Sequence, residues 1–165
     1  MNIGKFLPVP IAVGILAFLL MVISSQFNLL AWVAFITWGA YFLSGINTRG
    51  AVREGISFTL GIVFGILIVM IGTFLTPMTG MYAFPIAVAL AGFVIVYLEL
   101  VPWFDMAPGY FLGAAAFFAV GAKPDAATFI ALWIPAMLGL GLGVFTGYLR
   151  AVIFKIEGTK DPLKK

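Results

Sequence analysis

Glu99 and Asp105 stand six positions apart, between the end of one apolar segment and the start of a short one. Ionisable residues at the depth of a membrane are costly and usually functional, so chemistry is first sought at this pair. If the short segment begins below the headgroups, then Asp105, Pro108 and Gly109 line a vestibule beside the positive end of a helix. A path through that vestibule continues along the segment to Gly113, which makes these five residues candidates for a solute pathway.

A plainer interpretation of the same carboxylates remains open. Both are then solvated loop residues on the cytoplasmic side, with Asp105 capping the helix that follows it. Glu99 then has three basic candidates for an ion pair, Arg49, Arg53 and Arg150, which we expect on the same side.

The sequence lacks the residue types that most enzymes and metal sites use. It holds no cysteine and no histidine, which removes thiolate nucleophiles, zinc and iron–sulfur sites, and the usual proton shuttle. There is no phosphate-binding loop and no serine-hydrolase or metalloprotease motif. The centres of the apolar segments hold no ionisable residue. We therefore expect no enzyme, no cofactor, no metal site and no coupling to a proton or sodium gradient.

Small residues recur at every fourth position in two of the apolar segments. The third segment carries Gly61 and Gly65, and the sixth carries Gly139, Gly143 and Gly147. Because lipid tails are as apolar as leucine, membrane helices gain stability where small side chains let their backbones approach. We expect these glycines at helix-packing surfaces or at an interface between subunits. The alternative is that some of them line a narrow path.

Pro135 interrupts the sixth segment and is a further candidate for the pathway. Proline kinks a helix and frees the carbonyl four residues before it, here that of Ala131. A free carbonyl inside a membrane must find a partner or line a wet cavity.

The chain is too apolar to cover itself with a surface that suits water. Its 165 residues are 64% hydrophobic and 9% charged, with a mean hydropathy of +1.19, whereas a soluble domain carries about a quarter charged residues. We place six apolar runs at residues 8–25, 29–44, 56–75, 84–98, 109–121 and 126–149. The sequence therefore predicts an all-α, polytopic membrane protein with about six transmembrane helices, whose main partner is the lipid bilayer.

Two stretches depart from a simple bundle of spans. The fifth run has 13 residues and as a helix reaches about 20 Å, against about 30 Å of hydrocarbon, so we expect it to be short or broken. Residues 45–55 form the clearest polar loop. We treat residues 1–150 as a single six-helix transmembrane domain and residues 151–165 as a charged cytoplasmic tail.

The basic residues predict the orientation of the chain. With a cytoplasmic N-terminus and six crossings, Lys123 is the one basic residue outside. The remaining eight fall inside: Lys5, Arg49, Arg53, Arg150, Lys155, Lys160, Lys164 and Lys165. This positive-inside pattern places both termini in the cytoplasm. The net charge of +3 is therefore a topology signal and not a nucleic-acid patch.

Residues 60–67 resemble residues 142–149. Under this topology both stretches lie in the cytoplasmic half of the bilayer, whereas inverted repeats of transporters place equivalent stretches in opposite halves. We therefore interpret the likeness as two surfaces that pack together and not as an inverted repeat.

The segments 29–35, 40–42 and 107–119 carry a resemblance to a known family. The chain resembles the bacterial inner-membrane family catalogued as domain of unknown function 1097, over most of its length. The resemblance implies a small multi-pass protein of the bacterial inner (plasma) membrane. It supplies no activity, cofactor or site residue.

Two hypotheses for the function follow from these features. The first is a passive channel or facilitator for a small neutral or weakly polar solute, acting as a homo-oligomer because six short helices barely enclose a pathway. The second is a membrane scaffold or accessory subunit that transports nothing and binds a partner through its cytoplasmic face.

Overall fold

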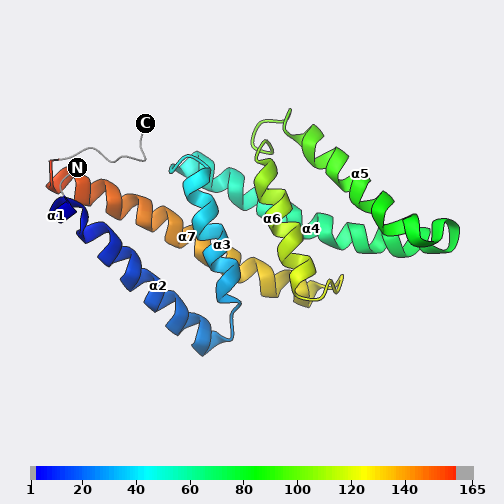
Figure 1. Cartoon of the computed structure of the whole chain (residues 1–165), viewed down its shortest axis with the longest axis horizontal. Coiled ribbons are helices and arrows are strands. Elements are labelled where there is room, and N and C mark those ends of the chain that lie inside the picture. The colour runs from blue at the N-terminus through cyan, green and yellow to red at the C-terminus, as the bar shows by residue number, and fades with distance from the viewer. Residues whose placement is uncertain (1–2, 159–165) are drawn as a thin grey trace.

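A computed structural model of the chain describes residues 3–158, and all regular secondary structure in that range is helical. The helices, shown in Figure 1, are α1 Ile3–Phe6, α2 Pro8–Phe27, α3 Ala31–Leu43, α4 Thr48–Thr79, α5 Ala83–Leu98, α6 Ala107–Ala119 and α7 Ala126–Ile156. One turn of 3₁₀-helix, η1 Gly80–Tyr82, lies between α4 and α5. The all-α fold expected from the sequence is confirmed.

Three helical segments are long and apolar enough to cross a membrane: Pro8–Phe27, Thr48–Leu98 and Ala126–Ile156. Helices α3 and α6 are apolar as well, with 13 residues each, so a second short helix accompanies the expected one. Large apolar side chains face outwards, and Phe74 and Phe93 expose 68% and 70% of their surface. Such a surface suits lipid and not water, so the chain is a multi-pass membrane protein.

The prediction that residues 45–55 form a polar loop is wrong for most of these residues. Helix α4 begins at Thr48, where the side-chain oxygen of Asn47 accepts a hydrogen bond of 2.7 Å from the backbone N–H of Gly50. This cap satisfies one of the N–H groups that a helix leaves free at its start. Arg53 and Glu54 therefore lie inside the helix.

Helix α7 likewise extends past the domain boundary expected at residue 150, and ends at Ile156. The first part of the expected tail, residues 151–156, is therefore a continuation of this helix. Lys160, Lys164 and Lys165 lie outside the described residues, and so does the end of the tail.

The helices form two halves of similar architecture, α2–α4 and α5–α7. Their lengths are 20, 13 and 32 residues in the first half and 16, 13 and 31 in the second. Figure 1 shows that the halves interlock, because α6 crosses α4 while α3 crosses α7. The short helix of each half is thus held against the long helix of the other.

Close backbone contacts repeat between the halves. A Cβ atom added to Gly61 of α4 would overlap the carbonyl oxygen of Tyr110 on α6, and one added to Gly139 of α7 would overlap that of Ala34 on α3. Tyr110 follows Ala34 by 76 positions, and Gly139 follows Gly61 by 78. The two contacts are therefore equivalent and indicate an internal two-fold axis.

The next turn of each long helix repeats the arrangement. A Cβ on Gly65 would meet the ring of Phe117, and a Cβ on Gly143 would meet the ring of Tyr41. The two aromatic residues are again 76 positions apart, and the two glycines 78. The internal repeat therefore extends along the whole crossing and is not one coincidental contact.

The turns that lead into the two long helices match as well. Gly45 and Gly121 have φ values of 102° and 98°, and the residue after each has a φ of 53°. The carboxylate of Asp125 then caps α7, accepting a 2.7 Å hydrogen bond from the backbone N–H of Thr128, as Asn47 caps α4. The same pair of positive-φ residues and the same kind of cap therefore turn the chain from each short helix into each long one, although the second turn is two residues longer.

The repeat is also present in the sequence once the register is known. Four residues are identical in the two long helices at a spacing of 78: Ile56 and Ile134, Leu60 and Leu138, Gly61 and Gly139, Gly65 and Gly143. The likeness noted between residues 60–67 and 142–149 compares the same helices four residues out of register. The likeness seen in the sequence therefore pairs residues that are not equivalent, and the repeat is not apparent from it.

The two caps predict different responses to pH. The backbone N–H of Thr128 holds the pKa of Asp125 below its usual value. Its contribution to stability is therefore present above the ordinary carboxyl pKa and lost as pH falls through the lowered one. Asn47→Ala should cost about 1 kcal/mol at any pH, whereas the loss of melting temperature in Asp125→Ala should shrink in acid. A deficit for Asp125→Ala that stays constant in acid would contradict this assignment.

Candidate functional site

The internal repeat draws attention to a position where the halves differ in chemistry. Glu54 of α4 is equivalent, at the spacing of 78, to Leu132 of α7. Both side chains are buried, with 2% and 0% of their surface exposed. Since an apolar residue suffices for packing in the second half, packing alone does not require a carboxylate at Glu54.

Glu54 lies on the face of α4 that packs against the start of α6. Its two carboxylate oxygens lie 3.2 and 3.3 Å from the place that a Cβ on Gly109 would take, and the Cβ of Ser57 lies 2.7 Å from it. Because residue 109 is a glycine, no side chain of α6 occupies this place and the carboxylate fits beside the backbone. The equivalent of Gly109 in the first half is Val33, which belongs with Leu132 to the main apolar cluster.

Oε1 of Glu54, a buried polar atom at this contact, has no hydrogen-bond partner within residues 3–158. Oγ of Ser57, also buried, makes no well-formed hydrogen bond there and lies near the phenol of Tyr110. Residues three apart lie on the same face of a helix, so both atoms belong to one place. A buried polar atom without a partner costs about 1–3 kcal/mol. Such an atom in a folded protein calls for an explanation, and in a membrane protein the default explanation is function.

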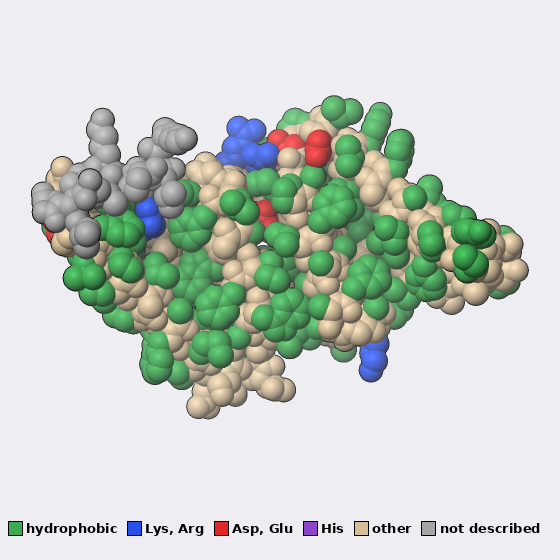
Figure 2. Space-filling model, viewed as in Figure 1, with side chains coloured by type: hydrophobic (Ala, Val, Ile, Leu, Met, Phe, Trp, Pro, Cys, Tyr) green, Lys and Arg blue, Asp and Glu red, His purple; other side chains and the backbone are tan. Residues whose placement is uncertain are grey.

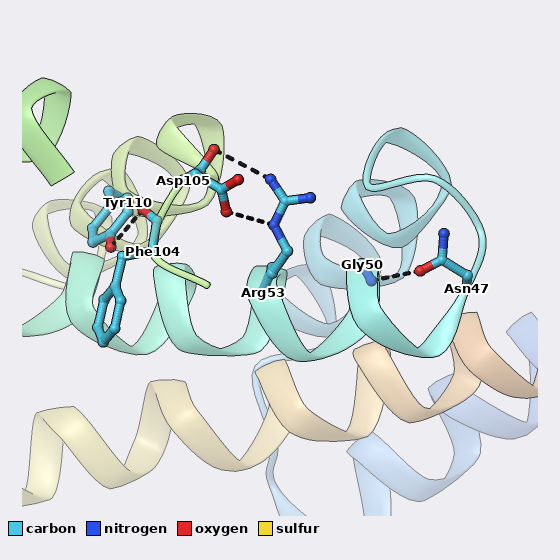
Figure 3. A network of polar contacts seen from close by, with 6 residues as sticks. All are labelled: Asn47, Gly50, Arg53, Phe104, Asp105 and Tyr110. Atoms are coloured by element: carbon cyan, nitrogen blue, oxygen red, sulfur yellow. Dashed lines mark hydrogen bonds and ion pairs between the residues drawn. The ribbon is translucent and has the colours of Figure 1, made fainter. Parts of the chain in front are cut away.

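An ion pair covers the site on the side of the α4 N-terminus. Nε of Arg53 lies 2.6 Å from a carboxylate oxygen of Asp105, with 23% and 32% of the two side chains exposed. A second guanidinium nitrogen of Arg53 donates to the carbonyl oxygen of Asp105 at 3.5 Å (Figure 3). The guanidinium of Arg49 lies over the ring of Trp103, 5.4 Å from its centre. These contacts fasten the segment before α6 to the first turns of α4.

Tyr110 closes the site from α6. Its side chain is fully buried, and its hydroxyl donates a 3.0 Å hydrogen bond to the carbonyl oxygen of Phe104 (Figure 3). Its ring meets that of Phe64 of α4 edge-on, with 5.9 Å between the ring centres. The turn before α6 and the helix itself are therefore tied together around the buried carboxylate.

The structure brings together only some of the expected pathway residues. Asp105 and Gly109 belong to the site, and Gly113 packs one turn further along α6 against the carbonyl oxygen of Phe58. Glu99 and Pro108 are exposed instead. Of the three basic partners considered for Glu99, Arg53 pairs with Asp105 instead. The alternative in which Asp105 caps α6 is wrong, because the N-cap residue is Met106, without a side-chain hydrogen bond.

Pro135 lies away from this site, buried in α7. At the spacing of 78 it is the equivalent of Ser57, so the second half carries proline and leucine where the first carries serine and glutamate. Nearby, the hydroxyl of Thr37 of α3 donates a 2.7 Å hydrogen bond to the carbonyl oxygen of Ala136.

The glycine stripes lie at contacts within the chain. Gly61 and Gly65 face α6, while Gly139, Gly143 and Gly147 face α3. All five are buried.

An open groove of about 720 Å³ runs along the outer side of α4 and α7. Its walls are mostly apolar and include Ile56, Leu140 and Val144. The indole N–H of Trp133 donates to the hydroxyl of Thr59 across it, at 3.2 Å. Both polar groups are thereby used, which leaves a surface suited to lipid tails or to another helix.

Comparison with known proteins assigns the chain to a family. The sequence matches the family described as "Protein of unknown function (DUF1097)" over residues 10–153. The chain belongs to this family. The matched region contains both halves of the repeat, apart from the first two residues of α2 and the last three of α7, and it includes the buried carboxylate, so the family extends over the complete site. No curated protein matches the chain significantly, and no solved structure does.

Glu54 is the site residue that sequence analysis missed, because it was assigned to a loop. A signal for it exists, since Gly50, Glu54, Ser57 and Gly61 are spaced by three or four positions. This is the spacing of one helix face, and it continues the small-residue stripe of α4 towards its start.

Proposed function

We propose that the protein is a passive channel or facilitator for a small neutral or weakly polar solute, acting as a homo-oligomer in the bacterial inner membrane. The observation that carries the proposal is the pair of interlocked halves. Many transport proteins consist of two such halves and bind solute near the membrane midplane, where the halves meet.

The proposal includes six crossings, made by α2 to α7. Three crossings in each half then insert the second half in the opposite direction to the first, as in an inverted repeat. Gly61 and Gly139 each lie 13 residues into their long helix, about 20 Å from its start, so both fall near the middle of the bilayer. An inverted repeat was rejected from the sequence when residues 60–67 were compared with residues 142–149. We propose it here with the two long helices aligned at a spacing of 78.

The distribution of charge supports this orientation. Figure 2 shows acidic and basic side chains gathered along one edge of the molecule, and a basic side chain projecting from the opposite edge. We assign the edge that carries Arg49, Arg53 and Asp105 to the cytoplasm and the loop with Lys123 to the outside. The buried carboxylate then lies below the cytoplasmic surface, behind the Arg53–Asp105 ion pair.

The short helices are suited to a permeation path. A helix of 13 residues reaches about 20 Å and does not cover the full hydrocarbon thickness of about 30 Å. Each therefore leaves a recess at one or both of its ends. Asp105 and Glu54 lie at the recess at the start of α6, where a polar solute would enter.

A second candidate function is favoured by the apolar groove along α4 and α7. A groove of about 720 Å³ with an apolar wall fits a partner helix, as expected of a scaffold or accessory subunit. In that case the glycine contacts only hold the fold together, and no solute passes.

Stopped-flow light scattering on proteoliposomes distinguishes the two functions. We expect one of water, urea, ammonia, glycerol or short carboxylic acids to permeate faster than through empty liposomes. Asp105→Ala should change that flux, because it removes the charge at the proposed entrance. Glu99→Gln is the matched control, since Glu99 is exposed and should leave the flux unchanged. Folded, inserted protein that accelerates none of these solutes would contradict the proposal and favour the scaffold.

A further inference from the structure

Among the described residues, no free positive charge lies against the buried carboxylate of Glu54 to balance it. The two basic side chains nearest to it along α4 are engaged, Arg53 with Asp105 and Arg49 with the ring of Trp103. An isolated ionised carboxylate in an apolar interior is so costly that it takes up a proton or a counter-ion instead.

We propose that Glu54 is a proton-binding site, which holds a proton in the packed arrangement of α4 on α6 and exchanges it with the cytoplasmic side. The proton bonds to one carboxylate oxygen, and no other bond changes. The hydroxyl of Ser57, on the same face of α4 and beside the phenol of Tyr110, provides an oxygen that can accept a hydrogen bond from the O–H of the acid.

The surroundings of Glu54 favour a proton over a larger cation. The nearer carboxylate oxygen already lies 3.2 Å from the position that a Cβ on Gly109 would take, so the carboxylate itself fills most of the space beside this glycine. A metal ion needs several oxygen ligands around it, whereas a proton needs one oxygen to hold it and one to accept its hydrogen bond.

The side chains that pack on this part of α4 from neighbouring helices add no balancing charge within the described residues. Helix α6 contributes the phenol of Tyr110, which donates to Phe104. Helix α3 contributes Tyr41, packed on Ala51. From α7, Leu140 lies against Gly55 of α4, and the indole N–H of Trp133 is bonded to Thr59.

A route for exchange leads past the ion pair at the rim. Arg53 and Asp105 are 23% and 32% exposed, so water reaches the residue beside Glu54 in the sequence. The other half lacks this site, since Leu132 and Pro135 take the places of Glu54 and Ser57. A proton therefore binds one half only, on the cytoplasmic side, and in a transport protein such a site allows solute movement to depend on pH. The assignment to the cytoplasmic side and this last step rest on the proposed function, whereas the binding of the proton does not.

Infrared spectroscopy of the reconstituted protein tests the site without any assay of flux. The chain has three glutamates and three aspartates, so few groups can contribute the C=O band of a protonated carboxyl. We expect this band at neutral pH, and we expect labelling with ¹³C-glutamate to shift it. It should be absent in Glu54→Gln, retained in Asp105→Asn, and lost reversibly as pH is raised.

The labelling experiment keeps the test decisive even if Glu54→Gln fails to fold, because it uses the wild-type chain. Glu99 is exposed and Glu157 lies at the end of the described helix α7, so Glu54 is the one buried glutamate among the described residues and a shifted band is assigned to it. Absence of a shifted band at neutral pH would overturn the proposal. Loss of the band on adding sodium or potassium at constant pH would also overturn it, in favour of a metal-cation site.

Discussion

Gly139→Ala is expected to destabilise the protein strongly, whereas Gly141→Ala, two residues along the same helix, is expected to have little effect. A Cβ at Gly139 would overlap the carbonyl oxygen of Ala34, while a Cβ at Gly141 has nothing within 4 Å. The obstacle at Gly139 is backbone, which cannot rotate away as a side chain can. Overpacking of this kind costs about 1–3 kcal/mol of stability. Because the backbone cannot move aside, we expect the cost at Gly139 to lie at or above the upper end of this range.

The same loss is expected from Gly61→Ala, since Gly61 meets the carbonyl oxygen of Tyr110 in the equivalent way. Thermal unfolding in detergent, followed by size-exclusion chromatography or circular dichroism, measures all three variants. Equal melting temperatures for Gly139→Ala and Gly141→Ala would show that α3 and α7 are not in close contact. A loss at Gly139 without one at Gly61 would show that the two crossings are not equivalent.

Glu54→Leu is expected to make the protein more stable. The substitution places in the first half the residue that the second half carries at Leu132, and it removes a buried oxygen without a partner among the described residues. The gain should be about 1–3 kcal/mol, the usual cost of such an atom. Stability gained by removing a polar group from a functional site commonly comes with lost function. A raised melting temperature is the measurement.

The reverse substitution, Leu132→Glu, is the matched control. It places a carboxylate against Val33, in the apolar cluster where no glycine leaves space. We expect it to destabilise the protein by more than Glu54→Leu stabilises it, because it adds both a buried polar group and an overpacked contact. A Glu54→Leu variant that is less stable than wild type would mean that Glu54 has a favourable partner.

The features of the fold that could be predicted from the sequence are those that follow from the composition of whole segments. Six apolar runs, the short run at residues 109–121 and the basic residues near their ends are all readable without coordinates. The glycines at 61, 65, 139, 143 and 147 were expected at packing surfaces, and the structure places them at contacts within the chain. Which helix each would meet depends on tertiary structure, which spacing alone does not specify.

The site was harder to predict because its signal looks like that of a loop. Arg49, Arg53 and Glu54 make residues 45–55 polar on average, so the start of α4 was placed eight residues late. The face that carries Gly50, Glu54 and Ser57 is nevertheless regular, and it would have extended the helix. The repeat was missed because the sequence alone does not show which residues of the two long helices are equivalent. That register becomes apparent only from the contacts that each long helix makes with a short helix.

The structure combines a symmetric scaffold with an asymmetric site. Equivalent turns, caps and glycine contacts shape both halves. The polar groups are concentrated at the start of α4 and α6, while the equivalent place at the start of α7 and α3 is apolar. The two halves therefore share a backbone arrangement and differ in chemistry at this place.

Labelling of single cysteines in sealed vesicles tests most directly whether the two halves cross the membrane in opposite directions. The chain has no cysteine, so Thr48→Cys and Ala126→Cys each introduce a unique thiol at the exposed first residue of α4 or α7. We predict that a membrane-impermeant maleimide labels Thr48→Cys only from the cytoplasmic side and Ala126→Cys only from the outside. Labelling of both from the same side would contradict the inverted arrangement and the transport function built on it.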